Sequence, residues 1–203
     1  MENRPLIDIF TAQLVRVAAK ILVQRCQFVR LLESWASPIH EQITQGEERL
    51  EITYLPSLPI GEEMGEEELI KLLTAKFEEI REREEERGIT LFGPHRDDLK
   101  FKVNGFDVHS YGSQGQQRTT ALSLKLAEIE LIKAEVGEFP ILLLDDVLSE
   151  LDDKRRAHLL KTIENKVQTF VTNTSLEGTD WPSLKQATIY QVRKGSVTLL
   201  QGE

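Results

Sequence analysis

The stretch Ile141-Leu142-Leu143-Leu144-Asp145-Asp146 decides the fold class of this chain. Four consecutive apolar residues are typical of a strand buried on both faces, as in a parallel sheet covered by helices. Two carboxylates then appear at the point where the strand ends. Adjacent acids also occur at helix starts, where they cap backbone N–H groups, so the pair has a purely structural interpretation as well. The buried strand predicts an α/β fold.

Strands that end in two acids occur in ATPases that bind phosphates through a glycine-rich loop, where the motif is called Walker B. In that arrangement the strand delivers the first carboxylate, here Asp145, to the shell of a magnesium ion. The second carboxylate, here Asp146, positions or polarises the attacking water. The residues that follow, Val147-Leu148-Ser149-Glu150-Leu151-Asp152, resemble the D-loop of ABC-type ATPases, which crosses a dimer interface beside the nucleotide. Within it, Ser149 and Asp152 are the candidate functional residues.

A second motif, Tyr111-Gly112-Ser113-Gln114-Gly115-Gln116-Gln117-Arg118, lies one predicted helix upstream of the strand. A small turn that leads into a helix exposes backbone N–H groups and the positive end of the helix dipole, which favours a bound phosphate. The alternative is a plain N-cap, with Ser113 closing the helix start. The order of signature loop, helix, apolar strand, two acids and D-loop resembles the head of an ABC-type ATPase.

Three stretches together resemble the RecF family. They are Gly93-Pro94-His95-Arg96-Asp97-Asp98-Leu99, Ser113 to Thr119 with the Leu122 to Glu128 segment after it, and Leu142 to Asp153. The resemblance is strong from Ile89 to about Ser175. It is weaker from Ile7 to Arg87, where the pattern is similar to the helical lever-arm domain of the family. We therefore expect a mainly helical, partial lever-arm domain at 1–88 and the C-terminal part of an ABC-type head at 89–203.

The resemblance also implies roles for single residues. Ser113, Gly115 and Gln116, with Gln114 in the same loop, would bind the γ-phosphate of ATP held by the opposite protomer. Asp145 would hold Mg²⁺ through water, and Asp146 would occupy the catalytic position, where many ABC proteins have glutamate. A shorter carboxylate at that position fits slow hydrolysis, as a switch requires. Asn173 is the candidate for the switch position after the next strand.

The main departure from the family is an absence. The sequence contains no G-x-x-x-x-G-K-[ST] loop, whose N–H groups and lysine bind phosphates. In the family this loop precedes the lever arm, so we expect a C-terminal portion that belongs to a weak ATPase and is inactive alone. The family resemblance implies an ATP-dependent homodimer on DNA at single-strand gaps, which binds RecR and, with RecO, helps to load RecA.

Other interpretations stay open at this point. The chain resembles the head of an SMC-type protein as well, because its first helix could be the root of a coiled coil. A non-enzymatic interaction module is the alternative from another class of protein, since binding through the heptad face or a sheet edge needs no nucleotide. A nuclease using Asp97, Asp98, Asp145 and Asp146 is a more distant third.

Composition limits the partners. The 203 residues carry a formal net charge of -9, concentrated in acids between Glu62 and Glu86, so DNA contact requires a local basic patch or a groove completed by other subunits. The candidate phosphate contacts are Arg16, Lys20, Arg25 and Arg30, which equally suit a solvated helix face. The single cysteine excludes an intramolecular disulfide, and we expect a cytoplasmic protein with no membrane span or signal peptide.

Periodicity predicts the remaining elements. Apolar residues recur every seventh position at Ile7, Leu14, Ile21, Phe28 and Trp35, which predicts a helix from Ile7 to about Ala36 with a seam for another long helix. Ser37-Pro38 predicts a kink or a new helix start. The other expected elements are a strand at 50–54, a helix at 66–87 capped by Gly88, hairpin strands at 99–103 and 106–108, helices at 116–135 and 153–165, a strand at 167–171, and a closing hairpin at 188–192 and 197–200.

The run His95-Arg96-Asp97-Asp98 contains residue types that ligate metals. Consecutive residues near a strand start point in different directions, so we favour a structural hydrogen-bond cluster, or a contact at a nucleotide or partner surface. His40, His109 and His158 have no partners at metal-ligand spacing, and we expect none of them to be catalytic.

Overall fold

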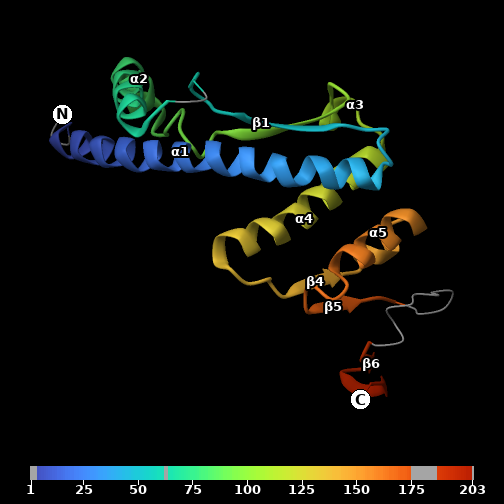
Figure 1. The fold of residues 1–203 in the computed structure, drawn as a ribbon. Coiled ribbons are helices and arrows are strands. Elements are labelled where there is room, and N and C mark those ends of the chain that lie inside the picture. The colour runs from blue at the N-terminus through green and yellow to red at the C-terminus, as the bar shows by residue number, and fades with distance from the viewer. Residues whose placement is uncertain (1–3, 62–63, 175–186, 203) are drawn as a thin grey trace. The chain divides into compact units, whose positions relative to one another are not determined.

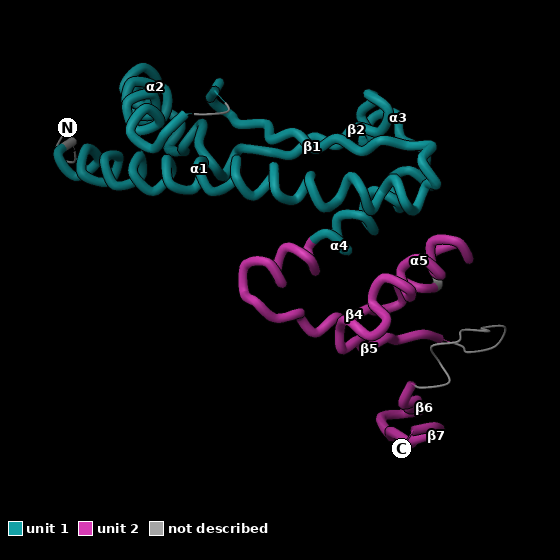
Figure 2. Tube along the Cα trace, in the orientation of Figure 1, with its two compact units in different colours: residues 1–127 teal, residues 128–203 magenta. Residues whose placement is uncertain are grey.

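The computed structural model describes residues 4–61, 64–174 and 187–202. The chain divides into two compact units, Met1–Ala127 and Glu128–Glu203, which Figure 2 shows in different colours. Helices and strands occur in both units, as the α/β prediction requires. In the described part of the chain, no helix combines the length and the apolar character that crossing a bilayer demands.

The first unit is built on one long helix beside a small sheet. Helix α1 (Arg4–Ile43) runs along the antiparallel strands β1 (Leu50–Leu55) and β2 (Asp98–Val103), and the two-residue strand β3 (Phe106–Asp107) completes the sheet (Figure 1). Alternation along β1 and β2 places Leu50, Ile52 and Val103 in a core shared with α1. The predicted hairpin is confirmed, because Asn104 and Gly105 both have positive φ, 51° and 83°, as a tight two-residue turn requires.

Helix α1 buries a different face from the heptad seam. The buried positions recur at helical spacing and include small residues that allow close approach; they are Val15, Ala18, Ala19, Leu22, Val29, Leu32, Ala36 and His40. In contrast, the seam residues Phe28 and Trp35 are 46% and 38% exposed. The packing of the seam against another long helix therefore stays a prediction.

The predicted helix start at Ser37-Pro38 is wrong, because α1 continues through Pro38 to Ile43, and the alternative of a kink at this position stays a prediction. Proline removes one helical N–H donor and normally disrupts a helix interior. Here the surrounding turn is held by tertiary contacts. Ala36 and His40 are fully buried on either side of Pro38, and the Ser37 hydroxyl donates a hydrogen bond of 2.6 Å to the carbonyl of Leu50.

Helix α2 (Glu66–Arg87) has the predicted bounds, and Gly88 caps it in the left-handed conformation at φ 64°. Its apolar face, Leu69, Leu73, Phe77 and Ile80, packs against the first half of α1. The Phe77 ring also lies on Phe92, with centroids 4.3 Å apart. This cluster fixes α2 and the segment that leads into Gly93 against α1.

Two helices follow the sheet. The single-turn helix α3 (Val108–Tyr111) begins where the second hairpin strand was expected to continue, because Asp107 caps it through a hydrogen bond from the backbone N–H of Ser110. Helix α4 (Gln114–Val136) then begins directly after Ser113. The signature loop therefore lies at the start of a 23-residue helix, as predicted.

The second unit contains a parallel strand pair and a hairpin. Strands β4 (Leu142–Asp145) and β5 (Thr169–Thr172) are parallel, and the turn η1 (Val147–Glu150) and helix α5 (Asp153–Ile163) connect them. Strands β6 (Ile189–Arg193) and β7 (Ser196–Gln201) form the predicted closing hairpin. The predicted burial of β4 on both faces is not found, since Leu144 is 8% exposed and Leu143 is 73% exposed. Only one face of β4 is covered by described residues of this chain.

Candidate functional site

The signature loop closes on itself through a reciprocal pair of hydrogen bonds. The backbone N–H of Gln116 donates to the Ser113 hydroxyl at 3.2 Å, and the backbone N–H of Ser113 donates to Oε1 of Gln116 at 3.0 Å. This is a capping box, which the S-x-x-Q spacing before an apolar helix produces. Ser113 and Gln114 are exposed, and Gly115 and Gln116 are half-buried. The loop is thus fixed in shape while its leading residues face solvent.

Gly112 sets the approach to this loop. A Cβ atom at Gly112 would lie 2.5 Å from the carbonyl oxygen of Val108, a distance at which the backbone must move. The Gly112 N–H donates to the same carbonyl at 3.0 Å. The tight turn between α3 and Ser113 therefore requires glycine for space.

The first acid of the Walker B strand contacts a residue that sequence analysis missed. Asp145 and Thr172 are partners in the β4–β5 register, and the Thr172 hydroxyl donates to Oδ1 of Asp145 at 2.5 Å. The same hydroxyl accepts a hydrogen bond of 3.1 Å from the backbone N–H of Asp146. The sequence signal that could have identified Thr172 is that it ends β5, the strand predicted to follow β4 in a parallel sheet. All three residues are exposed, so this strand end is open to a ligand.

Asp146 adopts the left-handed conformation, with φ 54° and ψ 11°. Few residues other than glycine take this conformation, and aspartate is among those that do. The turn ends β4 and directs the chain into η1. The second acid is therefore placed by a backbone turn and not by the alternation of the strand.

The predicted D-loop forms the η1 turn and the start of α5. Asp152 caps α5 by accepting a hydrogen bond of 3.0 Å from the backbone N–H of Arg155, and this bond holds the pKa of Asp152 below its ordinary value. Arg156 donates to the carbonyls of Leu148 and Leu151 at 3.0 and 2.9 Å, which braces the turn from α5. The backbone of Ser149 lies in η1, and its side chain is outside the described part of the structure.

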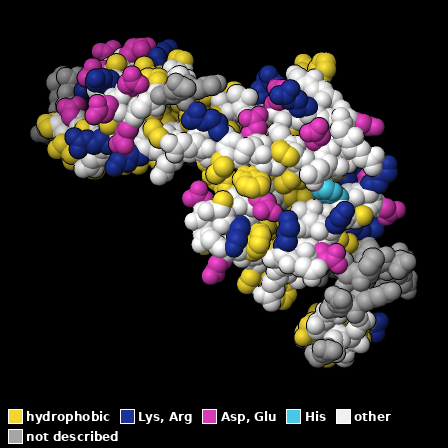
Figure 3. All heavy atoms as spheres, in the orientation of Figure 1, with side chains coloured by type: hydrophobic (Ala, Val, Ile, Leu, Met, Phe, Trp, Pro, Cys, Tyr) yellow, Lys and Arg dark blue, Asp and Glu magenta, His cyan; other side chains and the backbone are white. Residues whose placement is uncertain are grey.

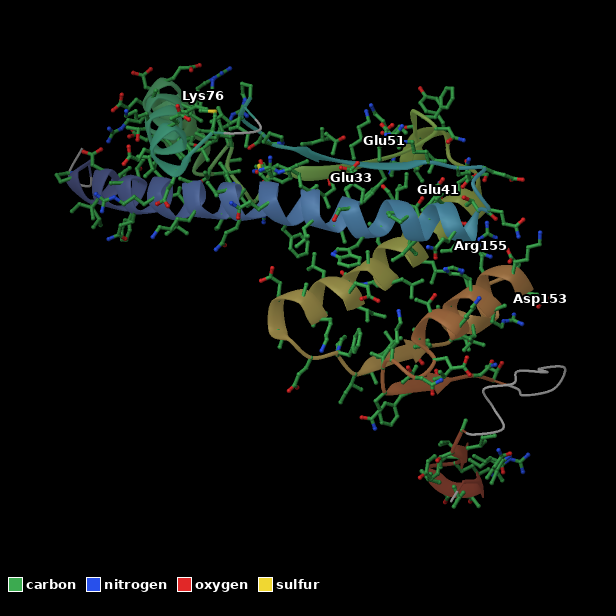
Figure 4. All side chains as sticks on the ribbon, in the orientation of Figure 1. Glu33, Glu41, Glu51, Lys76, Asp153 and Arg155 are labelled. Atoms are coloured by element: carbon green, nitrogen blue, oxygen red, sulfur yellow. The ribbon has the colours of Figure 1, made fainter. Side chains whose placement is uncertain are left out.

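Figure 4 shows Asp153 and Arg155 on α5. Asn173, the expected switch residue, follows β5 and is exposed, and its side-chain oxygen accepts a hydrogen bond of 2.8 Å from the backbone N–H of Thr174. The hydroxyl of Thr172, one residue earlier, contacts the Walker B carboxylate. Asn173 and Thr172 are thus the two candidate side chains at the end of β5 for sensing the γ-phosphate.

Hydrogen bonds connect the Gly93-to-Asp98 loop to α1, to β1 and to the segment after β1. Asp97 accepts hydrogen bonds from the hydroxyl of Tyr54 and, at 2.6 Å, from the backbone N–H of Ser57. Burial, followed by this contact with Asp97, raises the pKa of Tyr54 to about 12. The Arg25 side chain donates to the carbonyl of Pro94. These contacts support the structural interpretation of this run.

A metal centre of three or more His, Cys, Asp or Glu side chains is not found among residues 4–61, 64–174 and 187–202. Of the aspartates in the nuclease interpretation, Asp97 accepts hydrogen bonds from Tyr54 and Ser57. The strand end offers one carboxylate, Asp145, and the Thr172 hydroxyl. These hard oxygen donors suit Mg²⁺, which keeps several of its waters and takes one or two protein carboxylates beside phosphates.

A capped glycine-containing loop at the start of a long helix, together with a parallel strand that ends in an acid pair and leads into a braced turn, places this chain among the ABC-type ATPase heads. The chain belongs to the RecF family of DNA replication and repair proteins. It is 56% identical over 197 residues to DNA replication and repair protein RecF of Geobacillus sp. (strain WCH70), which covers 97% of this chain and 53% of that protein. RecF of Bacillus subtilis (strain 168) is 55% identical over 195 residues, with 96% and 53% covered.

The fold has a close match among solved structures. A structure of the recombination mediator protein RecF-ATP in the RecFOR pathway superposes with a TM-score of 0.84 at 36% identity, and the match covers 98% of this chain and 51% of that one. No protein-family model matches the chain. The chain spans about half the length of the curated relatives it matches.

Proposed function

We propose that this chain supplies two of the loops that close an ATP site in a RecF-type DNA replication and recombinational repair protein of the cytoplasm. In this proposal, residues 1–88 act as the lever arm and residues 89–203 as the C-terminal part of the head. ATP would be bound between two heads, so that the protein dimerises on DNA at single-strand gaps. The closed dimer would bind RecR and, with RecO, help to load RecA. The family membership of the chain supports this assignment.

The observation that carries the proposal is the capped signature loop. Ser113, Gln114, Gly115 and Gln116 surround the positive end of the α4 dipole, and the exposed start of the loop is available to a γ-phosphate from an opposite protomer. A loop whose shape is fixed before binding loses little entropy when the phosphate arrives.

The strand end supplies the other half of the chemistry. Bound Mg²⁺ would neutralise phosphate charge in the transition state. Asp145 would hold the ion through water, with its carboxylate oriented by the Thr172 hydroxyl. Asp146 would position the attacking water, and the D-loop residues Ser149 and Asp152 would meet the partner head. Asn173 would report the γ-phosphate from the end of β5.

DNA contact in this proposal depends on the assembled dimer. Figure 3 shows Lys/Arg and Asp/Glu side chains interspersed over α2 and the adjoining end of α1. Of the candidate phosphate contacts on α1, Arg25 already bonds the Pro94 carbonyl and Arg30 the Cys26 carbonyl. Both guanidinium groups keep their positive charge and further N–H donors, so these two bonds orient the arginines and leave them able to contact phosphate.

A non-enzymatic interaction module is the second candidate, and one observation favours it. The exposed seam of α1, which includes Leu14, Phe28 and Trp35, presents apolar side chains at the spacing that long helices use to pair. This surface would bind a helix whether or not nucleotide is present. The RecF membership makes an SMC-type head the weaker alternative.

The deciding experiment uses a RecF hybrid, in which this chain replaces the matching half of the Geobacillus relative. We expect the hybrid to hydrolyse ATP and to dimerise with ATP, whereas the chain alone does neither. Ser113→Arg and Asp146→Asn should each abolish hydrolysis. Ala121→Arg is the matched control, because Ala121 is exposed on the same helix and receives the same charge. A folded hybrid that neither hydrolyses ATP nor dimerises would support the interaction module instead.

A further inference from the structure

A carboxylate on the arm holds the side chain of Gln116. Nε2 of Gln116 donates to Oε1 of Glu48 at 3.0 Å, although the two residues are 68 positions apart in the sequence. Glu48 lies in the connection between α1 and β1. Its other oxygen, Oε2, lies 3.1 Å from Nε2 of His40, which is on α1. One carboxylate therefore bridges the signature loop and the long helix.

The histidine at the end of this bridge is anchored in the core. His40 is 0% exposed, and its Nδ1 lies 3.2 Å from the hydroxyl of Ser123 on α4, which is also 0% exposed. The Ser123 hydroxyl also donates to the carbonyl of Thr119 at 2.8 Å, and because a carboxylate only accepts hydrogen bonds, the contact of His40 with Glu48 is made by Nε2–H. The bridge thus contacts α4 twice, at its first turn and again two turns later.

A purely structural role, in which a buried histidine needs a hydrogen-bond partner, would explain the contact between His40 and Ser123. It does not explain why the carboxylate next to it reaches the signature loop. An apolar residue in place of His40 would fill the same space without the cost of burying a polar group. The amide of Gln116 is used at both ends, since Oε1 accepts from Ser113 and Nε2 donates to Glu48. The capping box therefore has its orientation set from the arm.

We propose that Glu48 is a positioning residue for the signature loop, which it fixes to the lever arm through His40. This inference rests on the proposed function, because it concerns how that loop meets ATP on an opposite head. Donors that are held in place before the ligand arrives bind it more strongly than donors that must reorder. Releasing Gln116 should therefore weaken closure of the dimer. Binding of ATP to the P-loop of its own protomer should be unaffected, since the signature loop acts on the other head.

The test compares three variants of the RecF hybrid in two assays. Glu48→Ala should raise the ATP concentration at half-maximal dimerisation about tenfold, which corresponds to ~1.4 kcal/mol. ATP binding by the monomer, measured with a fluorescent analogue at low protein concentration, should change less than about twofold. Glu47→Ala is the control, because Glu47 is the exposed neighbour in the same connection and should leave both values unchanged.

Glu48→Gln should restore dimerisation to within about threefold of the parent. Its side-chain carbonyl can accept from Gln116 as the carboxylate does, and its amide can donate to His40 when Nε2 carries no proton. Gln116→Ala also removes the acceptor for the Ser113 N–H, so it should cost more than Glu48→Ala, and the double variant should cost less than the sum of the two because the Glu48–Gln116 contact is lost in each. This rescue and non-additivity would not follow from a general loss of stability.

The failures are distinguishable. If the parent hybrid does not dimerise with ATP, the proposed function is overturned and the inference falls with it. If the parent dimerises and Glu48→Ala behaves as Glu47→Ala does, only the positioning role of Glu48 is overturned. A Glu48→Ala variant that loses monomer ATP binding as strongly as dimerisation would also overturn it. Should that variant fail to fold, Glu48→Gln carries the test, and a loss of dimerisation well beyond about threefold overturns the role of this contact.

Discussion

Removing one hydroxyl should weaken the use of magnesium at the end of β4. Thr172→Val keeps the shape of the side chain but removes the donor to Asp145 and the acceptor for the Asp146 N–H. A hydrogen bond to a charged group contributes about 1.5–3 kcal/mol when protected from water. Because all three residues are exposed, water replaces part of this contribution. We expect roughly 1 kcal/mol of lost Mg²⁺ affinity, which is about a fivefold change.

The assay is ATP hydrolysis by the RecF hybrid as a function of Mg²⁺ concentration at saturating ATP. Thr172→Val should shift the half-saturating Mg²⁺ concentration upward about fivefold, as estimated above. Thr172→Ser retains the hydroxyl and should behave like the parent. Thr169→Val is the control from the same strand, since its hydroxyl bonds the Val167 carbonyl and no carboxylate. An unchanged Mg²⁺ requirement in Thr172→Val would refute the orienting role of the hydroxyl.

Three further changes follow from the geometry. Gly112→Ala should displace the turn before Ser113, because its Cβ would meet the Val108 carbonyl at 2.5 Å, and should reduce ATP-dependent dimerisation of the hybrid; unchanged dimerisation would contradict the close approach. The Tyr54 phenol should titrate near pH 12 by ultraviolet absorbance. The folded pKa is raised, so its contribution to stability is complete below pH ~10 and lost as pH rises through about 12; a midpoint near 10 in the folded protein would refute this. Asp152→Ala should destabilise α5 by about 1 kcal/mol in urea unfolding. The lowered pKa of Asp152 means that this contribution is present above its unfolded value and is lost as pH falls through the folded one, so the variant and the parent should converge in acid.

Local patterns were sufficient for most elements of the fold. Asn104-Gly105 predicted its hairpin, and Gly88 predicted the end of α2, because each residue type suits a left-handed backbone. The buried face of α1 was not predictable from the heptad alone. Apolar residues lie on two adjacent stripes of that helix. The buried stripe contains Ala19, which packs with α2, and Ala36, which packs with the sheet, and these small side chains allow the closest approach. Tertiary contact also overrode the helix-breaking tendency of Pro38.

The site was predictable where it is contiguous in sequence. The sequence offered a cap at Ser113 as the alternative to a phosphate-binding turn, and the apolar run before Asp145 predicted a strand that ends in acids. Thr172 was missed because its partner is on the neighbouring strand, and strand register cannot be read from either strand alone. Glu48 was missed for the same physical reason, since its contact with Gln116 joins distant segments of the chain.

The left-handed turn at Asp146 restricts which side chains this position can hold. A longer acid such as glutamate would reach further toward a nucleotide, but outside glycine, asparagine and aspartate this backbone conformation costs roughly 1–2 kcal/mol. A change to glutamate would therefore strain the peptide that joins β4 to η1. If Asp146 positions the attacking water as proposed, the lifetime of bound ATP would depend in part on this one backbone conformation.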